Sequence, residues 1–244
     1  DKKKQVLSSI EEQGKLTDEL KASILAAQTM VVVEDLYRPY RPKRRTRATI
    51  AKEKGLEPLA KLILEQKTEE PLENTAKDYV SQEKEVANEQ EALAGACDIL
   101  AEMISDEADY RMEIRRRTMK KGQIVSSAKD EKASSVYEKY YDASEPVAQI
   151  ASHRVLALNR GEKEKFLTVK IEAPEEEILR YLEKRIIRKD NNPYTTPVLK
   201  ATIADAYRRL IAPAIEREVR NELTEKAEDA SIRVFGKNLE QLSR

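Results

Sequence analysis

The residues best suited to chemistry lie in one basic stretch, residues 37–47, which reads YRPYRPKRRTR. It contains no acid and six basic side chains: Arg38, Arg41, Lys43, Arg44, Arg45 and Arg47. Because proline fixes φ and lacks a backbone N–H, Pro39 and Pro42 predict a stiff extended loop here. Arginine presents planar donors to phosphate, and tyrosine rings such as Tyr37 and Tyr40 can stack on a base or a guanidinium. This basic loop is therefore a candidate nucleic-acid contact.

A structural interpretation of the basic loop stands beside the functional one. Arginine-rich loops often cap helix ends or pair with acidic neighbours, and Glu34 and Asp35 lie immediately upstream. The chain as a whole balances 45 Lys+Arg against 45 Asp+Glu, so acidic partners are plentiful. Runs of charge alone do not decide between nucleic-acid contact and internal pairing. The two interpretations differ in whether carboxylates of the molecule itself occupy the arginines.

A second basic cluster, residues 111–121, reads RMEIRRRTMKK. Helical spacing predicts that Arg116 and Lys120 share one face of a helix. A solvated helix end, with cations near its carboxyl terminus, is the favoured interpretation. Arg115, Arg116 and Arg117 are secondary candidates for contact with phosphate or with a polymerase surface.

Residue types for catalysis and metal binding are scarce. His153 and Cys97 are the only histidine and cysteine, too few for a nitrogen- or sulfur-rich zinc site. The sequence contains no glycine-rich phosphate loop and no HExxH, CxxC or GxSxG motif. His153 could act as a general base, although a structural histidine is the commoner case. We expect no enzyme, no metal and no cofactor; an enzyme would need a pocket that gathers His153 with carboxylates.

The composition predicts a mainly α protein. The 244 residues are 40% hydrophobic and 37% charged, with six Gly, two Phe and no Trp. No apolar run approaches the ~20 residues of a membrane span, and no signal peptide is visible. The single cysteine cannot form a disulfide within the chain. These features predict a cytoplasmic location without membrane contact. Because the sequence begins without Met and inside a predicted helix, we expect a fragment of a longer protein.

Boundary signals predict the elements that position the basic loop. Residues 2–13 read as a helix closed by Gly14, and Thr17 as the N-cap of one helix that runs to about residue 36. That helix carries an apolar stripe of Leu20, Ile24, Ala27 and Val31. After the loop, a helix at 48–54, a turn at Gly55 and a helix opened by Pro58 form an αα-hairpin that resembles a helix-turn-helix in outline.

The rest of the chain reads as helices around a small β insertion near 122–172. A helical zone at roughly 74–120 breaks near Ser81 and Ser105, and small residues at 92–101 predict a close helix contact. Two strands, 122–129 and 164–173, alternate in polarity and can pair. Helices follow from residue 175 and over 198–243, where Pro213 starts a new turn or kinks the helix. The predicted fold is an elongated multi-helix array with segments 1–70, 71–195 and 196–244.

Four blocks of the sequence resemble the bacterial Tex family, the transcription accessory proteins. The first is LYRPYRPKRRTRATIAKEKGLEPLAKLI (36–63); the others lie at 92–102, 142–167 and 205–242, in the family's order. The resemblance implies a cytoplasmic protein that binds nucleic acid and is linked to transcription. It covers the helical N-terminal region only, ahead of an RNase-H-like domain, helix-hairpin-helix elements and a C-terminal OB-fold RNA-binding domain. No catalytic residue of the family maps here, and the resemblance assigns no role to the loop arginines.

Two functional hypotheses follow from these observations. The first is a non-catalytic helical module of an RNA-binding transcription accessory protein, which contacts RNA or DNA through the basic loop and has RNA polymerase as a further candidate partner. The second is a structural scaffold or protein-interaction module that packs against downstream domains or polymerase without touching nucleic acid. The choice between RNA and DNA, and between single and double strands, stays open at this level.

Overall fold

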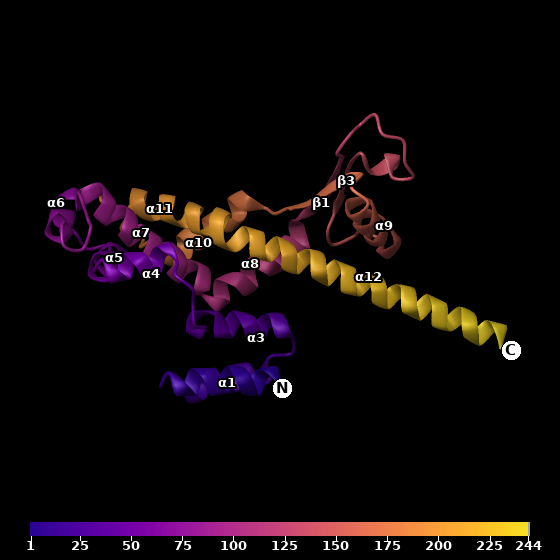
Figure 1. Ribbon diagram of the computed structural model, residues 1–244, viewed down its shortest axis with the longest axis horizontal. Helices are drawn as coiled ribbons and strands as arrows, with labels where there is room; N and C mark the ends of the chain where they lie inside the picture. Colours follow the sequence, from indigo (N-terminus) through magenta and orange to yellow (C-terminus); the bar gives the residue numbers. More distant parts are fainter. Residues whose placement is uncertain (244) are drawn as a thin grey trace. The chain divides into compact units, whose positions relative to one another are not determined.

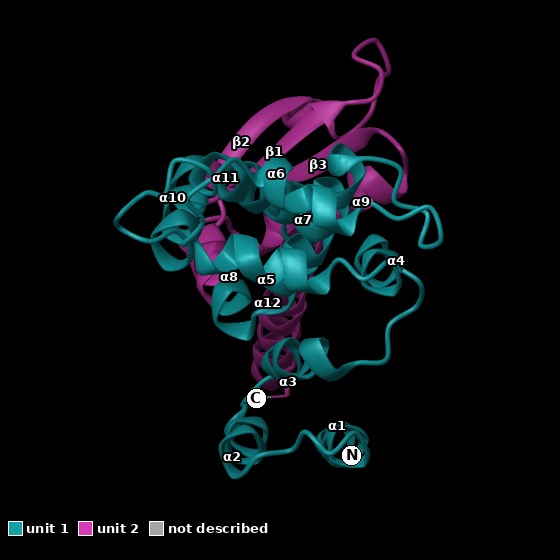
Figure 2. Cartoon of the chain, turned by 90° about the vertical axis from the view of Figure 1, so that its left-hand side faces the viewer, with its two compact units in different colours: residues 1–112, 176–212 teal, residues 113–175, 213–244 magenta. Residues whose placement is uncertain are grey.

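The computed structural model describes residues 1–243, which form a mainly helical chain with one small antiparallel sheet (Figure 1), as predicted. The chain divides into two compact units, each built from two separate stretches (Figure 2). Unit 1 comprises residues 1–112 and 176–212; unit 2 comprises residues 113–175 and the chain from 213 onward. None of the helices described in residues 1–243 has the length and apolarity needed to cross a bilayer.

Unit 1 begins with three short helices, α1 (Lys2–Glu12), α2 (Asp18–Ala26) and α3 (Met30–Tyr37), which share a small core. Thr17 caps α2 as predicted, accepting a hydrogen bond from the Leu20 N–H at 3.1 Å. The prediction of a single helix over 18–36 is wrong, because the backbone is extended at Ala27 and a second helix begins after its N-cap, Thr29. The Thr29 hydroxyl accepts from the Val32 N–H at 3.3 Å, a cap that competes with continued helix.

The basic loop is only partly extended. Residues Arg38–Tyr40 form one 3₁₀ turn, η1, that prolongs α3, and the chain is extended from Arg41. Pro39 fits this turn because the first residues of a helix need no N–H partner inside it. Arg47, predicted as a loop residue, is the first residue of α4 (Arg47–Glu53), which Thr46 caps.

The larger core of unit 1 surrounds α7 (Glu89–Asp106). The elements that contact it include α4, α5 (Glu57–Glu65), α6 (Leu72–Ala76) and α11 (Thr196–Asp205), with the short turn η2 (Lys77–Tyr79). The helix pair predicted around Gly55 is present, with Gly55 at φ +77°. The predicted close contact is confirmed at Gly95, where a Cβ would overlap Leu56. The breaks predicted near Ser81 and Ser105 are confirmed: residues 80–88 form a turn closed by a Ser81–Val86 bridge, and α7 ends at Asp106.

The second basic cluster begins on a buried side chain and ends, as predicted, with the exposed Lys120 and Lys121 in the last turn of its helix. Arg111 of α8 (Ala108–Lys121) is 1% exposed and donates to the carbonyl and the hydroxyl of Ser105 at the end of α7. It also reaches the Leu210 carbonyl at 3.4 Å, in a π-helical segment, η4 (Ala206–Ile211). The segment η4 precedes Pro213 and leads into α12 (Ala212–Leu242). Its irregular π-helical geometry is explained by Pro213, because proline lacks the backbone N–H that a regular helical turn needs. The helix α10 (Glu175–Ile186) begins where the chain passes from unit 2 back into unit 1, between residues 175 and 176.

Unit 2 contains a three-stranded sheet in the order β2-β1-β3. The central strand β1 (Gln123–Ala128) pairs antiparallel with β2 (Asp142–Pro146) and β3 (Leu167–Glu172). Both β1 and β3 were predicted, and Leu167, Val169 and Ile171 face the buried side as expected. The strand β2 was not predicted, because DASEP lacks apolar alternation. The helix α9 (Ser152–Lys163) packs against β3, and the 3₁₀ turn η3 (Glu138–Tyr140) contacts β1 and β2.

Within unit 2, α12 covers the free edge of β3. Glu216 accepts from the Ile171 N–H at 3.0 Å, and Arg220, one turn later, donates to the Val169 carbonyl at 3.3 Å. The buried residues of α12 are Ile215, Val219, Leu223 and Ala227, and every residue from 231 to 243 is exposed. The helix therefore satisfies backbone groups that an open edge strand would present for pairing with another chain.

Candidate nucleic-acid interface

The two tyrosines of the basic loop pack against the core of α1, α2 and α3. Both rings lie partly buried on that core, and the Tyr37 hydroxyl lies 2.9 Å from the Ser9 hydroxyl. The Arg41 guanidinium carbon sits 5.6 Å from the Tyr37 ring centroid, a cation–π distance. The Tyr40 carbonyl accepts from the Gln13 side-chain amide at 2.7 Å. These contacts favour a packing role for Tyr37 and Tyr40.

Three of the six basic side chains in the loop pair with carboxylates. Arg41 pairs with Glu34, and Arg45 lies 3.3 Å from Glu53. Lys43 pairs with Asp106 and lies 3.6 Å from Glu102, both on α7. The contacts of Lys43 with Asp106 and Glu102 attach the loop to α7, the central helix of unit 1.

Lys43 sits beside a groove of mixed charge. Burial lowers the pKa of the Lys43 ammonium, while Glu102 opposes that shift. The groove has a volume of about 420 Å³ and places three basic side chains opposite four acidic ones: Arg41, Lys43 and Lys52 against Glu57, Glu102, Asp106 and Glu107. A phosphate that entered this groove would be repelled by its carboxylates, so the groove is poorly suited to binding nucleic acid.

The remaining basic residues of the loop differ in exposure. Arg44 and Arg47 are exposed, and neither forms an ion pair within the described residues. Arg45 keeps 69% of its side chain exposed despite its pair with Glu53. Arg38 is half-buried, and its Nε has no hydrogen-bond partner among residues 1–243. The loop thus presents Arg44, Arg45 and Arg47 to solvent.

Carboxylates of unit 2 form ion pairs with Arg115, Arg116 and Arg117 of the second basic cluster. Arg115 binds Glu218 of α12 at 2.9 Å with 12% of its side chain exposed. Arg116 and Arg117 both bind Glu113, at 2.6 and 2.8 Å. The hydrogen bond from Arg116, with further help from Arg117, lowers the pKa of Glu113 to about 2. Arg115, Arg116 and Arg117 therefore each have a carboxylate partner, and Arg116 keeps 57% of its side chain exposed.

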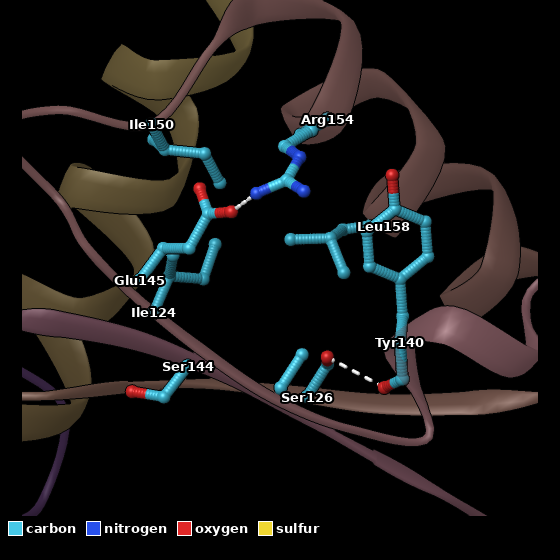
Figure 3. Close-up of a pocket in the computed structure, with 9 residues that line it drawn as sticks. Ile124, Ser126, Tyr140, Ser144, Glu145, Ile150, Arg154 and Leu158 are labelled. Carbon is cyan, nitrogen blue, oxygen red and sulfur yellow. Dashed lines mark hydrogen bonds and ion pairs between the residues drawn. The ribbon is translucent and has the colours of Figure 1, made fainter.

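The single histidine precedes a residue that lines a small cavity of unit 2, but it does not line that cavity itself. His153 is exposed at the start of α9, whereas the following Arg154 points toward Glu145 of β2 and pairs with it (Figure 3). The cavity holds about 10 Å³, room for about one water and no substrate. The Arg154–Glu145 pair thus joins α9 to β2, and this cavity does not supply the pocket that an enzyme hypothesis requires.

A cationic groove on α10 and α11 escaped the sequence analysis. Its volume is about 470 Å³, and it is lined by five basic residues, one acid and two others: Arg180, Lys184, Arg188, Lys189, Lys200, Glu183, Ile187 and Asn191. We call it the α10 groove. The signal that could have found it is the recurrence of Arg180, Lys184 and Arg188 at four-residue intervals, which predicts one basic helix face. From the sequence, that segment is predicted only as a helix.

Comparisons with known proteins point to one family. Residues 66–235 match the family model described as Tex central region-like. The chain is 50% identical to the protein YdcI of Bacillus subtilis over 99% of this chain and 34% of the relative. It is 34% identical to the transcriptional accessory protein Tex of Neisseria gonorrhoeae over 99% of this chain and 32% of that protein. It is 30% identical to human S1 RNA-binding domain-containing protein 1, over 97% of this chain and 25% of that protein. The chain spans about a third or less of these relatives.

Proposed function

The chain belongs to the Tex family, and from that membership we propose that it is a non-catalytic helical module with which a transcription accessory protein contacts nucleic acid. The observation that carries the proposal is the exposure of Arg44 and Arg47, free of ion pairs among residues 1–243, on a loop without acids. RNA is the preferred ligand, because one relative is named for an S1 RNA-binding domain. A cytoplasmic location and RNA polymerase as a partner belong to the same proposal.

The pairing pattern ranks the loop residues as phosphate ligands. Arg44 and Arg47 can bind phosphate without breaking an existing pair. Arg45 has only an exposed pair with Glu53, of a kind worth about 0–1 kcal/mol, so it can exchange a carboxylate for a phosphate. Lys43 lies between Glu102 and Asp106 and contributes least. Such contacts depend on salt and carry no sequence preference.

The test is binding of labelled single-stranded RNA and duplex DNA by wild type and by Arg44→Ala/Arg47→Ala, across a salt series. Losing about two phosphate contacts should reduce the slope of log affinity against log salt by about 1.4 for a single strand. Lys15→Ala/Lys21→Ala, which removes two exposed charges from the α1–α2 region, is the matched control. Equal affinity and slope in all three proteins would refute the loop assignment.

A second candidate function, a scaffold, is favoured by the attachment of Lys43 to α7. If the loop serves to fasten α3 to the α7 core, Lys43→Ala should lower the free energy of unfolding and leave RNA affinity unchanged. Under the nucleic-acid proposal, Arg44→Ala/Arg47→Ala should do the reverse. The pair of variants therefore separates the two functions in one set of measurements.

A further inference from the structure

We infer that the α10 groove binds the phosphate backbone of nucleic acid, an assignment that rests on the proposed function and adds a second contact surface to it. The groove collects charge from three places: Arg180 and Lys184 on α10, Arg188 and Lys189 just beyond its end, and Lys200 on α11. Against these five cations stands one acid, Glu183, which leaves a local net charge of +4 (five minus one) in a chain with a net charge of +0.

These five cations are not occupied by carboxylates. None of them forms an ion pair within the part of the chain that the structure describes, in contrast to Arg41, Lys43 and Arg45 of the basic loop. Cations that no carboxylate neutralises raise the local concentration of anions and can bind phosphate without first losing a partner. On this criterion the α10 groove is a better anion site than the loop that the sequence drew attention to.

The helix dipole explains only part of this cluster. Cations in the last turn of a helix offset roughly half an elementary charge at the carboxyl end, which accounts for Lys184. Arg188 and Lys189 lie beyond the last turn, and Lys200 belongs to a different helix. The convergence of these separate segments on one groove needs an anionic ligand.

The end of α10 is held in place by two buried or half-buried amides. The Gln66 side chain accepts from the Arg188 N–H at 2.8 Å and donates to the Ile186 carbonyl at 2.9 Å, with 3% of the residue exposed. Asn192 accepts from the N–H groups of Tyr194 and Thr195 and donates to the Thr68 carbonyl at 2.8 Å. The loop that carries Arg188 and Lys189 is thus fixed at both ends, which reduces the entropy lost on binding.

The lining also indicates what the ligand presents. Arginine forks and lysine ammonium groups match phosphate oxygens, and successive cations on α10 lie about 6 Å apart along the helix axis. The lining contains no aromatic ring on which a base could stack, and Asn191 is its only side-chain amide. A groove of this kind holds the backbone and reads few base edges, so we expect binding without sequence preference.

The experiment compares wild type with Arg188→Glu/Lys189→Glu and with a control of equal charge change, Arg233→Glu/Lys237→Glu, on the exposed end of α12. Fluorescence anisotropy with a labelled oligouridine and a mixed-sequence duplex, at several salt concentrations, gives affinity and slope. We expect the groove variant to lose at least about tenfold in affinity at low salt and to show a flatter slope. The control should stay within about twofold of wild type, and circular dichroism melting checks that each variant is folded.

Three outcomes would overturn the inference, and they differ in what else they overturn. If the groove variant binds like wild type while Arg44→Ala/Arg47→Ala binds weakly, the groove assignment fails and the proposed function stands. If wild type binds neither nucleic acid at the lowest salt, both fail. If poly-glutamate competes for the groove as well as RNA does, phosphate recognition is wrong and an acidic protein is the partner.

Discussion

Among single side chains, Arg111 is one whose polar contacts should contribute measurably to stability. Its buried guanidinium donates to the Ser105 carbonyl and hydroxyl and to the Leu210 carbonyl, so it joins the end of α7 to the π-helical segment. Arg111→Met keeps the apolar stem but leaves these acceptors without their donor, and should lower the free energy of unfolding by about 1–3 kcal/mol. Urea unfolding measures the change. Arg45→Met, at an exposed pair, should change it by less than about 1 kcal/mol; equal effects would contradict the structural role of Arg111.

Glu113 should make stability depend on acid pH. Its folded pKa of about 2 lies below the ordinary 4.5, so ionised Glu113 stabilises the fold above pH 4.5, and that contribution disappears as pH falls from 4.5 towards 2. Because a quarter of the side chain is exposed, we expect about 1 kcal/mol at pH 7. Glu113→Gln should be less stable than wild type by that amount at pH 7, and the gap should close at acid pH. A gap that is constant from pH 7 to pH 3 would show that the carboxylate charge is not responsible.

At the scale of helices, two glycines in similar positions should respond in opposite ways to alanine. Gly95 lies within α7, where a Cβ would overlap buried Leu56 and come within 3.3 Å of the Ala51 Cβ. Overpacking costs about 1–3 kcal/mol and exceeds the gain of about 1 kcal/mol in helix propensity, so Gly95→Ala should lower the urea midpoint. Gly236 of α12 has nothing within 4 Å, and Gly236→Ala should leave the midpoint unchanged or raise it. A stabilised Gly95→Ala would mean that α4 and α7 can separate without cost.

Helix boundaries were predictable where one residue type decides them. Thr17 supplies a side-chain acceptor, and Gly55 tolerates positive φ, so both marked their boundaries correctly. The break at Ala27 was not predicted, because the helical spacing of apolar residues continues through it. Thr29 caps the next helix, but in the sequence it cannot be told from a polar residue on the exposed face of a continuous helix. The strand β2 was missed because its pairing with β1 is made by the backbone, and its side chains carry no apolar alternation.

The candidate interface was predictable in composition but not in pairing. The basic loop stands out in the sequence, yet Lys43 meets Asp106 from 63 residues away, a contact that only the packing of the loop on α7 creates. The α10 groove shows the opposite case. Its helix has a readable basic spacing, but Lys200 joins it through the packing of unit 1. Charge in the sequence therefore indicates candidate binding surfaces, but ion pairs formed in the folded structure decide which of those charges are free to bind a ligand.

At the scale of the whole molecule, the division into two units follows from how the chain crosses between them. The chain leaves unit 1 within α8, returns at the start of α10 and leaves again at the start of α12. Neither unit is one continuous stretch of sequence, so each depends on a segment delivered from elsewhere in the chain. For unit 2 that segment is α12, which covers the edge of β3 through Glu216 and Arg220 and buries Ile215, Val219 and Leu223.

The continuous part of unit 2 should therefore not fold alone. In residues 113–175 by themselves, the Ile171 N–H and the Val169 carbonyl lose their partners, and Arg115 loses Glu218. Joining residues 213–243 to this fragment through a flexible Gly/Ser linker restores all three contacts. We expect well-dispersed amide resonances in the NMR spectrum of the joined protein, and poorly dispersed amide resonances, typical of an unfolded chain, for residues 113–175. The joined protein with Glu216→Ala/Arg220→Ala should fall between them, because burial by α12 remains while edge pairing is lost. A dispersed spectrum from 113–175 alone would mean that the sheet and α9 stabilise themselves, with α12 as an accessory.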